Sequence, residues 1–301
     1  MIPNNVAIIG LGLIGGSIGL ATREMLPQVA TTGWDANPDV RRRAAERGLV
    51  ANVCESAEDA VRDADLVILC VPVGAMGEAA ATIASALPAG TIVSDVGSSK
   101  RSVGNAIAKA LPGATVIPAH PVAGTEKSGP DAGFAELFRH RWCIVTPPSD
   151  APAEAVAIVS DFWEGLGAKI EIMDPAHHDV VLAVTSHIPH LIAYTIVGTA
   201  SDLEDVTRGE VIKYSAGGFR DFTRIAASDP TMWRDVFLTN RDAVLEVLGR
   251  FTEDLTALQR AIRNGDGDTL FELFERTRAI RRSIIEEGQD DARPDFGRSD
   301  H

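Results

Sequence analysis

The segment Val6-Ala7-Ile8-Ile9-Gly10-Leu11-Gly12-Leu13-Ile14-Gly15-Gly16-Ser17 decides the fold of the N-terminal half. Its first four residues are typical of a buried strand, and an apolar helix is predicted from Ile18 to Met25. A GxGxxG pattern in this setting allows a tight turn, and it lets a pyrophosphate approach the backbone at the N-terminus of a helix. The segment therefore predicts a dinucleotide site. The residues expected to bind there are Gly10, Gly12, Leu13, Ile14 and Gly15.

An acidic residue after the next predicted strand bears on the choice of dinucleotide. That strand runs from Ala30 to Trp34 and ends at Asp35, about twenty residues past the last glycine of the motif. A carboxylate there accepts hydrogen bonds from the adenosine ribose and repels a 2′-phosphate, so NAD is expected and NADP is less favoured. Two alternatives stay open. In the first, Asp35 is only a turn residue before Asn37-Pro38 and does not contact the ribose. In the second, an arginine of Arg41-Arg42-Arg43 binds the 2′-phosphate of NADP.

Strand and helix patterns continue to alternate over the rest of the first half. Alternation of this kind predicts a parallel sheet with helical crossovers, the doubly wound α/β arrangement. The expected strands are Leu66–Val71, Thr91–Val96, Ala114–Ile117 and Trp142–Thr146, and the expected helices are Ala44–Arg47, Ala57–Arg62 and Ala75–Ala86.

Ligands of doubly wound sheets bind at the carboxyl ends of the strands, and distinctive segments follow three of these ends. They are Cys70-Val71-Pro72-Val73, Asp95-Val96-Gly97-Ser98-Ser99-Lys100 and the stretch that begins at Pro118. We expect the three to meet on one edge, near the nicotinamide. Val71, Pro72 and Ser98 would then contact the cofactor. Residues 98–100 also suit the N-cap of a following helix, because serine is favoured there, and the two roles are compatible.

The stretch Pro118-Ala119-His120-Pro121-Val122-Ala123-Gly124-Thr125-Glu126-Lys127-Ser128-Gly129 gathers an imidazole, a carboxylate, an ammonium and hydroxyls. Its proline and glycine residues predict a loop. Taken alone, the loop is as consistent with a solvated turn as with a functional site. Its position after a strand of a dinucleotide-binding sheet favours function.

From Asp174 onward the pattern is helical. His177-His178-Asp179 opens an apolar helix predicted to reach Ala200, and this helix contains Ser186-His187-Ile188-Pro189-His190. A proline within a helix costs about 3 kcal/mol or more and usually kinks it. The proline is therefore either a tolerated kink or a bend that aims His187 and His190. These histidines lack the i, i+4 spacing of zinc motifs, so no metal is expected.

The remaining segments predict an anion-binding turn and a helical interface. Arg220 and Arg224 lie four residues apart in Ser215–Arg224, and guanidinium groups bind carboxylates in a bidentate manner. Asp229 is expected to cap the next helix. The helices predicted over Asn240–Ile262 and Asp268–Glu287 carry apolar stripes, which suggest that this half also packs against a second subunit.

Length and composition limit the possible classes of protein. The 301 residues suggest two domains, at 1–173 and 174–287, followed by a polar tail at 288–301 that is expected to be disordered. The net charge of −14 argues against a nucleic-acid partner and gives no support to a membrane surface. No run is expected to reach the roughly 20 uncharged apolar residues that a membrane helix needs, and the start lacks the features of a signal peptide, so we expect a cytoplasmic protein. The three widely spaced cysteines are expected to be reduced.

Read together, these motifs resemble the prephenate/arogenate (cyclohexadienyl) dehydrogenase family. The resemblance covers about residues 5 to 285 and rests on GLGLIGGS, DVGSSK, AHPVAGTEKSG, HHDVVLAVTSHIPH, GGFRDFTR and DPTMWRD. It implies a Rossmann-type domain followed by an all-α domain, as in 6-phosphogluconate dehydrogenases, and a homodimer formed through the helical domain. The implied reaction is the NAD-dependent oxidative decarboxylation of prephenate to 4-hydroxyphenylpyruvate, of L-arogenate to L-tyrosine, or of both.

The resemblance also implies roles for single residues. His120 would accept the proton of the ring hydroxyl, and Ser99 would hydrogen-bond the same hydroxyl. Arg224 would hold the ring carboxylate. A histidine with an ordinary pKa near about 6.5 suits such a base, so kcat/KM is expected to rise with pH near that value. The other residues expected on the substrate side of the site are His190, His187, Glu126, His178 and Thr125.

Two other functions remain open at this stage. One is another two-domain NAD(P)-dependent hydroxyacid or imine dehydrogenase, although such enzymes usually rely on a lysine in the first long helix and the run from His178 to Ala200 has none. The other is a non-catalytic dinucleotide sensor, which predicts a broken acid–base set. His120, Ser99 and Arg224 are all present, which counts against a sensor.

Overall fold

The N-terminal part of the molecule is built on a six-stranded parallel sheet. The computed structural model describes residues 2–125, 127–202 and 217–286. In sheet order the strands are β3 (Asn52–Val53), β2 (Ala30–Trp34), β1 (Asn5–Ile9), β4 (Leu66–Leu69), β5 (Ile92–Asp95) and β6 (Thr115–Val116). Each neighbouring pair is parallel, which confirms the doubly wound arrangement.

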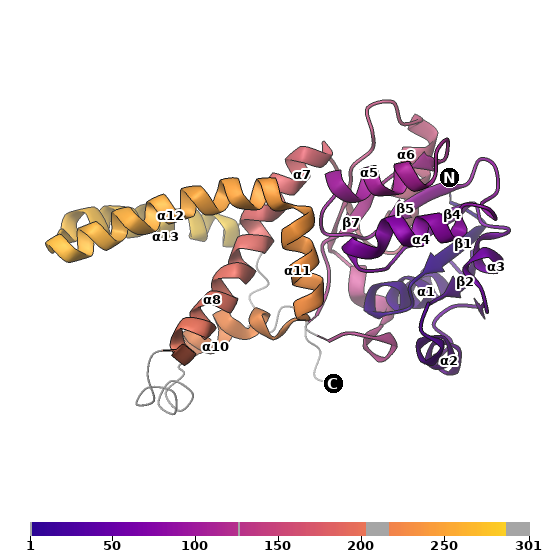
Figure 1. The fold of residues 1–301 in the computed structure, drawn as a ribbon, viewed down its shortest axis with the longest axis horizontal. Helices are drawn as coiled ribbons and strands as arrows, with labels where there is room; N and C mark the ends of the chain where they lie inside the picture. Colours follow the sequence, from indigo (N-terminus) through magenta and orange to yellow (C-terminus); the bar gives the residue numbers. More distant parts are fainter. Residues whose placement is uncertain (1, 126, 203–216, 287–301) are drawn as a thin grey trace. The chain divides into compact units, whose positions relative to one another are not determined.

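Helices cover both faces of this sheet (Figure 1). Val6 and Ile8 of β1 point into one core and Ala7 and Ile9 into the other, because successive side chains of a strand alternate between faces. The first core is closed by α1 (Leu13–Met25), α2 (Pro38–Arg47) and α6 (Ala153–Gly165), and the second by α3 (Ala57–Val61), α4 (Met76–Ile83) and α5 (Arg101–Ala110).

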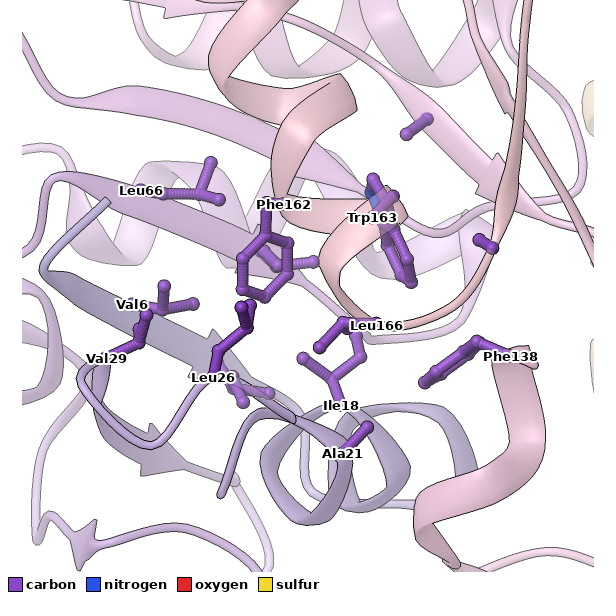
Figure 2. Packing of buried hydrophobic residues seen from close by; sticks show 14 of the residues in the cluster. Val6, Ile18, Ala21, Leu26, Val29, Leu66, Phe138, Phe162, Trp163 and Leu166 are labelled. Atoms are coloured by element: carbon purple, nitrogen blue, oxygen red, sulfur yellow. The ribbon is translucent and has the colours of Figure 1, made fainter. Parts of the chain in front are cut away.

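The first core is filled by aromatic residues of the crossover segments. Figure 2 shows Phe162 and Trp163 of α6 lying above Ile18 of α1 and above Leu26, which follows α1, with Phe138 beside them. The rings of Phe138 and Trp163 meet edge to face, with their centroids 5.2 Å apart. This packing fixes α1 against the sheet, and with it the glycine turn that precedes α1.

The turn between β1 and α1 explains two glycines of the motif. Gly10 has a φ of 100°, which favours glycine, and a Cβ on it would lie 2.6 Å from the carbonyl oxygen of Cys70. A Cβ on Gly15 would lie 1.9 Å from the carbonyl oxygen of Gly10. The helix begins at Leu13 and not at Ile18, because the glycines themselves form its first turn.

A second, three-stranded sheet departs from the sequence-based prediction. Its order is β7 (Ala119–Pro121), β8 (Trp142–Val145) and β9 (Lys169–Ile172), with the first pair antiparallel and the second parallel. His120 therefore lies on a short strand paired with Ile144, and not in the predicted loop. The prediction was wrong here because the ladder to β8 decides the conformation, and that ladder is formed between distant residues.

The apolar helical run begins as predicted but is not broken at its proline. It consists of α7 (Pro175–Leu182), a π-helical segment (Ala183–His187) and α8 (Ile188–Asp202). Pro189 is the second residue of α8, just past the π turn, where the hydrogen-bonding pattern has already changed. A π turn inside a helix widens it locally and is often found at functional sites. Here it carries His187.

The run Pro175–Asp202 is also long and apolar enough to cross a membrane by length and composition, and an 18-residue window within it has a mean hydropathy of 1.7. The expectation that no run reaches this length was therefore wrong. A single helix of this length and composition does not by itself indicate a membrane span, since helices in the cores of soluble proteins share both properties. This run carries the buried polar side chains of His178, Asp179 and His187. The cytoplasmic location stays a prediction.

Helices complete the described chain. They are α10 (Gly217–Thr223), a 3-10 turn (Arg224–Ala227), α11 (Pro230–Thr239), α12 (Arg241–Asn264) and α13 (Gly267–Glu286). Asp229 caps α11 by accepting a hydrogen bond from the Met232 N–H, as predicted. Contacts divide the chain into two units, Met1–Leu245 and Glu246–His301. The predicted tail at 288–301 lies outside the described residues, and the predicted domain division stays a prediction.

Candidate active site

The turn between β1 and α1 has the form of a pyrophosphate site. A Cβ on Gly12 would meet no described atom within 4 Å, so packing does not require glycine at this position. The open space is what a pyrophosphate needs to approach the backbone. The first N–H groups of α1, at Leu13 and Ile14, have no partners within the helix and carry the positive end of its dipole. The residues present therefore fit the predicted dinucleotide.

Asp35 lies at the end of β2, beside this turn. Its carboxylate accepts hydrogen bonds from the Leu11 N–H and the Asn37 N–H, both at 2.9 Å. It is therefore tied to the glycine turn and is more than a turn residue before Asn37-Pro38. The three nearby arginines all have partners within the protein. Arg41 donates to the backbone carbonyl of Asp35 at 2.8 Å, Arg42 pairs with Asp39, and Arg43 pairs with Glu46 and Asp131.

Two histidines and an aspartate form a buried hydrogen-bonded chain. His120 of β7 lies with its Nδ1 2.9 Å from Nε2 of His178 on α7. The Nδ1 of His178 lies 3.0 Å from Oδ1 of Asp179. The two oxygens of Asp179 also accept the backbone N–H groups of Lys100 and Arg101, at 2.7 and 3.0 Å. The side chains of His120, His178 and Asp179 are all buried, and His120 is 8% exposed.

The contact of Asp179 with two N–H groups also corrects a prediction about α5. Ser98, Ser99 and Lys100 are the predicted candidates to cap this helix. Its N-cap residue is Lys100, but the Lys100 side chain makes no capping hydrogen bond. The carboxylate of Asp179 from α7 takes the place of a local cap. A carboxylate at a helix N-terminus is stabilised by the dipole as well as by the two hydrogen bonds.

A buried ion pair lies beneath His120 and was not anticipated as part of the site. The ammonium of Lys100 is bonded to Oδ2 of Asp95 and to the carbonyl oxygen of Ala119, and both ionic side chains are fully buried. Burial lowers the pKa of Lys100 and raises the pKa of Asp95, and each charge opposes the shift of the other. DVGSSK contains both residues, but spacing alone does not reveal that they bond to each other.

Ser99 is fully buried and reaches α11. Its Oγ lies 2.9 Å from Oγ1 of Thr239, and Thr239 donates its own proton to the carbonyl oxygen of Asp235 at 2.8 Å. Ser99 is therefore the donor to Thr239. The neighbouring Ser98 is half-buried at the end of β5, as are Cys70 and Val71 at the end of β4, and Pro72 is exposed.

His187 is held by an asparagine that sequence reasoning missed. The side-chain nitrogen of Asn240 lies 3.1 Å from Nδ1 of His187 and donates to the carbonyl oxygen of Asp179 at 2.8 Å. An amide nitrogen only donates, so Nδ1 of His187 is the acceptor and the ring proton lies on Nε2. This Nε2 is buried and makes no hydrogen bond of ordinary geometry with the described residues, although a contact of the ring with the Ser98 backbone opposes the lowering of its pKa.

His190 lies one turn further along, against Trp233 of α11. The two rings are stacked, with centroids 3.6 Å apart and planes at 24°. Its Nδ1 donates to the Ser186 carbonyl oxygen at 2.8 Å, which leaves Nε2 as an acceptor. Trp233 was not predicted as a site residue, although DPTMWRD pointed to the segment. Arg224 is exposed, and its charge contributes to a lowered pKa of His190, of which burial is the larger cause.

The remaining predicted residues lie beyond β7. Thr125 is exposed and its hydroxyl accepts the Lys127 N–H at 3.2 Å. Glu126 lies outside the described residues. The end of this segment is fixed against the cofactor turn, because the Phe134 N–H donates to Oγ of Ser17 at 3.1 Å. The stretch from His120 to Phe134 therefore connects the buried histidine to α1.

The buried histidines do not keep ordinary pKa values. Burial, with the neighbouring charges of His178, Lys100 and His187, lowers the pKa of His120 well below 6.5. Burial also lowers the pKa of His178, opposed by the hydrogen bond to Asp179, and lowers that of His187 to about 4. The expectation of a pKa near 6.5 for His120 was therefore wrong, because a buried imidazolium loses its hydration.

Comparison with known proteins places the chain. Residues 18–172 match the family model described as the nucleotide-binding domain of prephenate dehydrogenase, and residues 174–276 match the one described as its dimerization domain. The chain belongs to the prephenate dehydrogenase family. The resemblance seen in the sequence is thereby confirmed, and the chain is a nicotinamide-dinucleotide-dependent dehydrogenase.

Relatives of this prephenate dehydrogenase family member cover nearly its whole length. It is 48% identical over 280 residues to the cyclohexadienyl dehydrogenase of Zymomonas mobilis, covering 93% of this chain and 96% of that one. It is 32% identical to the prephenate dehydrogenase of Bacillus subtilis, covering 92% and 75% of the two chains.

Solved structures of the family share the fold. The prephenate dehydrogenase of Aquifex aeolicus in complex with hydroxyphenyl propionate and NAD+ is 33% identical with a TM-score of 0.87, covering 93% of this chain and 98% of that one. The arogenate dehydrogenase of Synechocystis is 25% identical with a TM-score of 0.79, covering 93% and 99%. These likenesses confirm the predicted Rossmann-type domain followed by a helical region.

Proposed function

We propose that this chain carries out the NAD-dependent oxidative decarboxylation of prephenate to 4-hydroxyphenylpyruvate, of L-arogenate to L-tyrosine, or of both. Family membership supplies the reaction class. The observation that carries the assignment to this site is the buried imidazole of His120, which ends a hydrogen-bonded chain at the edge of the sheet where nicotinamides bind. When bound, the nicotinamide accepts a hydride from the ring carbon that bears the hydroxyl.

His120 is proposed as the base that accepts the hydroxyl proton. Removal of this proton drives electrons from the ring oxygen towards the carbon that loses its hydride, and loss of carbon dioxide then makes the ring aromatic. The lowered pKa keeps the imidazole neutral at physiological pH, which a base requires. Its strength as a base is correspondingly reduced, so orientation and exclusion of water must contribute much of the rate.

Ser99 is proposed to bind the same ring oxygen. Its hydroxyl proton is directed at Thr239 in the structure, and rotation about its Cβ–Oγ bond would redirect it to the substrate. This would stabilise negative charge on the oxygen as the proton leaves. His187 offers a second donor, because Asn240 holds the ring proton of His187 on its buried Nε2.

Arg224 is proposed to hold the ring carboxylate. Its exposed guanidinium lies near enough to His190 to affect the pKa of that ring. A cation here gives an acidic protein of net charge −14 a local site for a dianionic substrate. His190, stacked on Trp233, would lie on one side of the bound substrate and Thr125 on another, and the role of Glu126 in substrate binding stays a prediction.

NAD is proposed as the preferred cofactor. The carboxylate of Asp35 is held beside the glycine turn, where it would meet the adenosine ribose and repel a 2′-phosphate. Arg41, Arg42 and Arg43 are engaged with carbonyl or carboxylate groups, so a 2′-phosphate would have to displace existing partners.

A homodimer formed through the helical part is also proposed. In the described residues of Glu246–His301, Ala261 is the one apolar side chain that is buried. Large apolar side chains remain exposed on α12 and α13: Leu255, Ile262, Phe271, Phe274 and Ile280. Exposed apolar side chains gathered on two helices favour a protein–protein interface. The family model matched here describes a dimerization domain.

The testing experiment offers prephenate and L-arogenate separately to the purified protein, each with NAD and with NADP. Formation of the reduced cofactor is followed by its absorbance. Turnover of either substrate supports the proposal, and the ratios of kcat/KM give the substrate and cofactor preferences. Absence of turnover of both, with NAD still bound, would contradict it and would favour a dinucleotide sensor or a different hydroxyacid substrate.

A further inference from the structure

We infer that His178 and Asp179 act as positioning residues, which hold the proton of His120 on Nδ1 so that Nε2 is the nitrogen that meets the substrate. The inference rests on the proposed function, because it takes His120 as the base. It adds a role for Asp179, and it replaces a contact of His178 with substrate by a contact with the base.

The argument starts at Asp179. Burial opposes its ionisation, but hydrogen bonds from His178, the Lys100 N–H and the Arg101 N–H outweigh burial and lower its pKa. Both of its oxygens therefore act only as acceptors. Because these N–H groups belong to the start of α5, the carboxylate is fixed in position by a helix and not by a mobile side chain.

The tautomers of the two histidines follow in order. Nδ1 of His178 faces an oxygen that only accepts, so it must carry the proton. A lowered pKa keeps the ring neutral, and Nε2 of His178 therefore holds a lone pair. His120 must then donate from Nδ1 across the 2.9 Å contact, which leaves the lone pair of His120 on Nε2. In other carboxylate–histidine pairs, too, the hydrogen bond at one ring nitrogen determines which nitrogen of the imidazole acts as the base.

The hydrogen-bonded chain of His120, His178 and Asp179 can also carry the proton that the base takes from the substrate. When Nε2 of His120 takes the hydroxyl proton, the O–H bond breaks and an N–H bond forms. The Nδ1 proton of His120 can then pass to Nε2 of His178, so that the positive charge lies beside the carboxylate of Asp179. Loss of carbon dioxide leaves a phenolate oxygen, to which the same chain returns the proton. No further reactant is needed.

The other charged groups around His120 make this placement of charge useful. Lys100 and Asp95 pair with each other below β7, and His187 is held neutral by burial in the π segment. Burial is the largest cause that disfavours a positive charge on His120, followed by His178, Lys100 and His187. Asp179 is the carboxylate connected to the base, through His178. The charge is therefore better accommodated on the His178–Asp179 pair than on His120 alone.

A direct test is nitrogen NMR of the full-length protein with 15N-labelled histidine, at a pH where its seven histidines are neutral. A protonated and a bare ring nitrogen have well-separated shifts, and His120→Asn identifies the signals of His120. We expect a protonated Nδ1 and a bare Nε2. A protonated Nε2, or an averaged mixture of tautomers, would overturn the inference. This readout does not depend on turnover, so it is distinct from a failure of the proposed activity.

Variants of His178 separate its two hydrogen bonds. In His178→Gln the side-chain oxygen falls near the place of Nε2 and still accepts from His120, whereas in His178→Asn the amide falls near Nδ1 and the acceptor is lost. We expect His178→Asn to mix the tautomers of His120 and to lower kcat about a hundredfold, within the range typical of general base catalysis. His178→Gln should keep the tautomer and lose less.

Asp179→Asn tests the start of the hydrogen-bonded chain, because an amide has only one accepting oxygen and cannot accept from His178, the Lys100 N–H and the Arg101 N–H as the carboxylate does, so the proton of His178 is no longer held on Nδ1. We expect a mixture of His120 tautomers in this variant, which a purely structural role of Asp179 would not explain. His177→Asn is the matched control, since His177 is the exposed neighbour on the same helix. Unchanged His120 tautomers and unchanged kcat in both His178→Asn and Asp179→Asn would overturn the inference.

Discussion

Burial of His120 among two further histidines and a lysine changes the pH at which it can act as a base. The ring works in its neutral form, and burial and the neighbouring charges lower its pKa well below 6.5. Lowering the pH through about 6.5 should therefore leave kcat/KM unchanged, and activity should fall only at more acidic pH. The measurement is the pH profile of kcat/KM under conditions in which chemistry limits the rate. An acid limb at or above about 6.5 would contradict the burial of the base.

Arg224 can be tested as the carboxylate ligand through the division between KM and kcat. A charge-assisted hydrogen bond is worth about 1.5–3 kcal/mol, so Arg224→Ala should raise KM roughly tenfold to a hundredfold with little change in kcat. The matched control is Arg62→Ala, an exposed arginine on the Rossmann-type domain that pairs with Asp59. An unchanged KM in Arg224→Ala would remove Arg224 from this role.

Asp35 can be tested by the ratio of the two cofactors. Asp35→Ser removes the charge that repels a 2′-phosphate while keeping a hydroxyl that can bond to the ribose. We expect kcat/KM with NADP to improve relative to NAD by about tenfold, or ~1.4 kcal/mol. Asp63→Ser serves as the control, because Asp63 is an exposed aspartate of the same domain that follows α3. An equal ratio in both variants would mean that another residue selects the cofactor.

At the scale of the element, the turn between β1 and α1 contains glycines with separate tasks. A Cβ on Gly15 would collide with backbone, and a Cβ on Gly12 would enter open space. Gly15→Ala should therefore destabilise the fold by about 3 kcal/mol, whereas Gly12→Ala should leave the melting temperature unchanged and weaken NAD binding. Thermal unfolding and an NAD titration of both variants make the comparison. Normal NAD affinity in Gly12→Ala would place the pyrophosphate elsewhere.

The run α7–π–α8 shows how one element serves several parts of the site. α7 carries His178 and Asp179, the π turn carries His187, and α8 carries His190. Asp179 in turn caps α5 of the Rossmann-type domain. A change at the start of α5 would therefore alter the histidine chain, although the two lie far apart in the sequence.

At the scale of the whole molecule, the exposed apolar side chains of α12 and α13 predict an obligate assembly. Phe271 is 66% exposed and Ile262 is 67% exposed in the single chain. Phe271→Asp should place a charge in the proposed interface and reduce the mass in solution from twice 31.9 kDa to 31.9 kDa. Light scattering coupled to size exclusion measures this. Glu253→Asp controls for changes on the polar surface of α12, and a wild-type protein of 31.9 kDa would contradict the dimer.

The sequence by itself determined the features that depend on neighbouring residues. The glycine turn, the strand Ala30–Trp34 with Asp35 after it, and the cap of α11 at Asp229 all follow from local backbone chemistry. The alternation of strands and helices was equally clear, because buried parallel strands form short apolar runs. These local signals were sufficient to predict the fold class and to recognise the family.

Only the tertiary structure decided the chemistry around His120. Its strand forms by pairing with Ile144, its Nδ1 meets His178, and the helix below it is capped by Asp179. Each of these contacts joins residues more than twenty positions apart, so no local pattern encodes them. Burial, and with it the lowered pKa of His120, is likewise a property of the packed molecule. The sequence names the residues of the site, and packing decides which nitrogen, which tautomer and which charge they present.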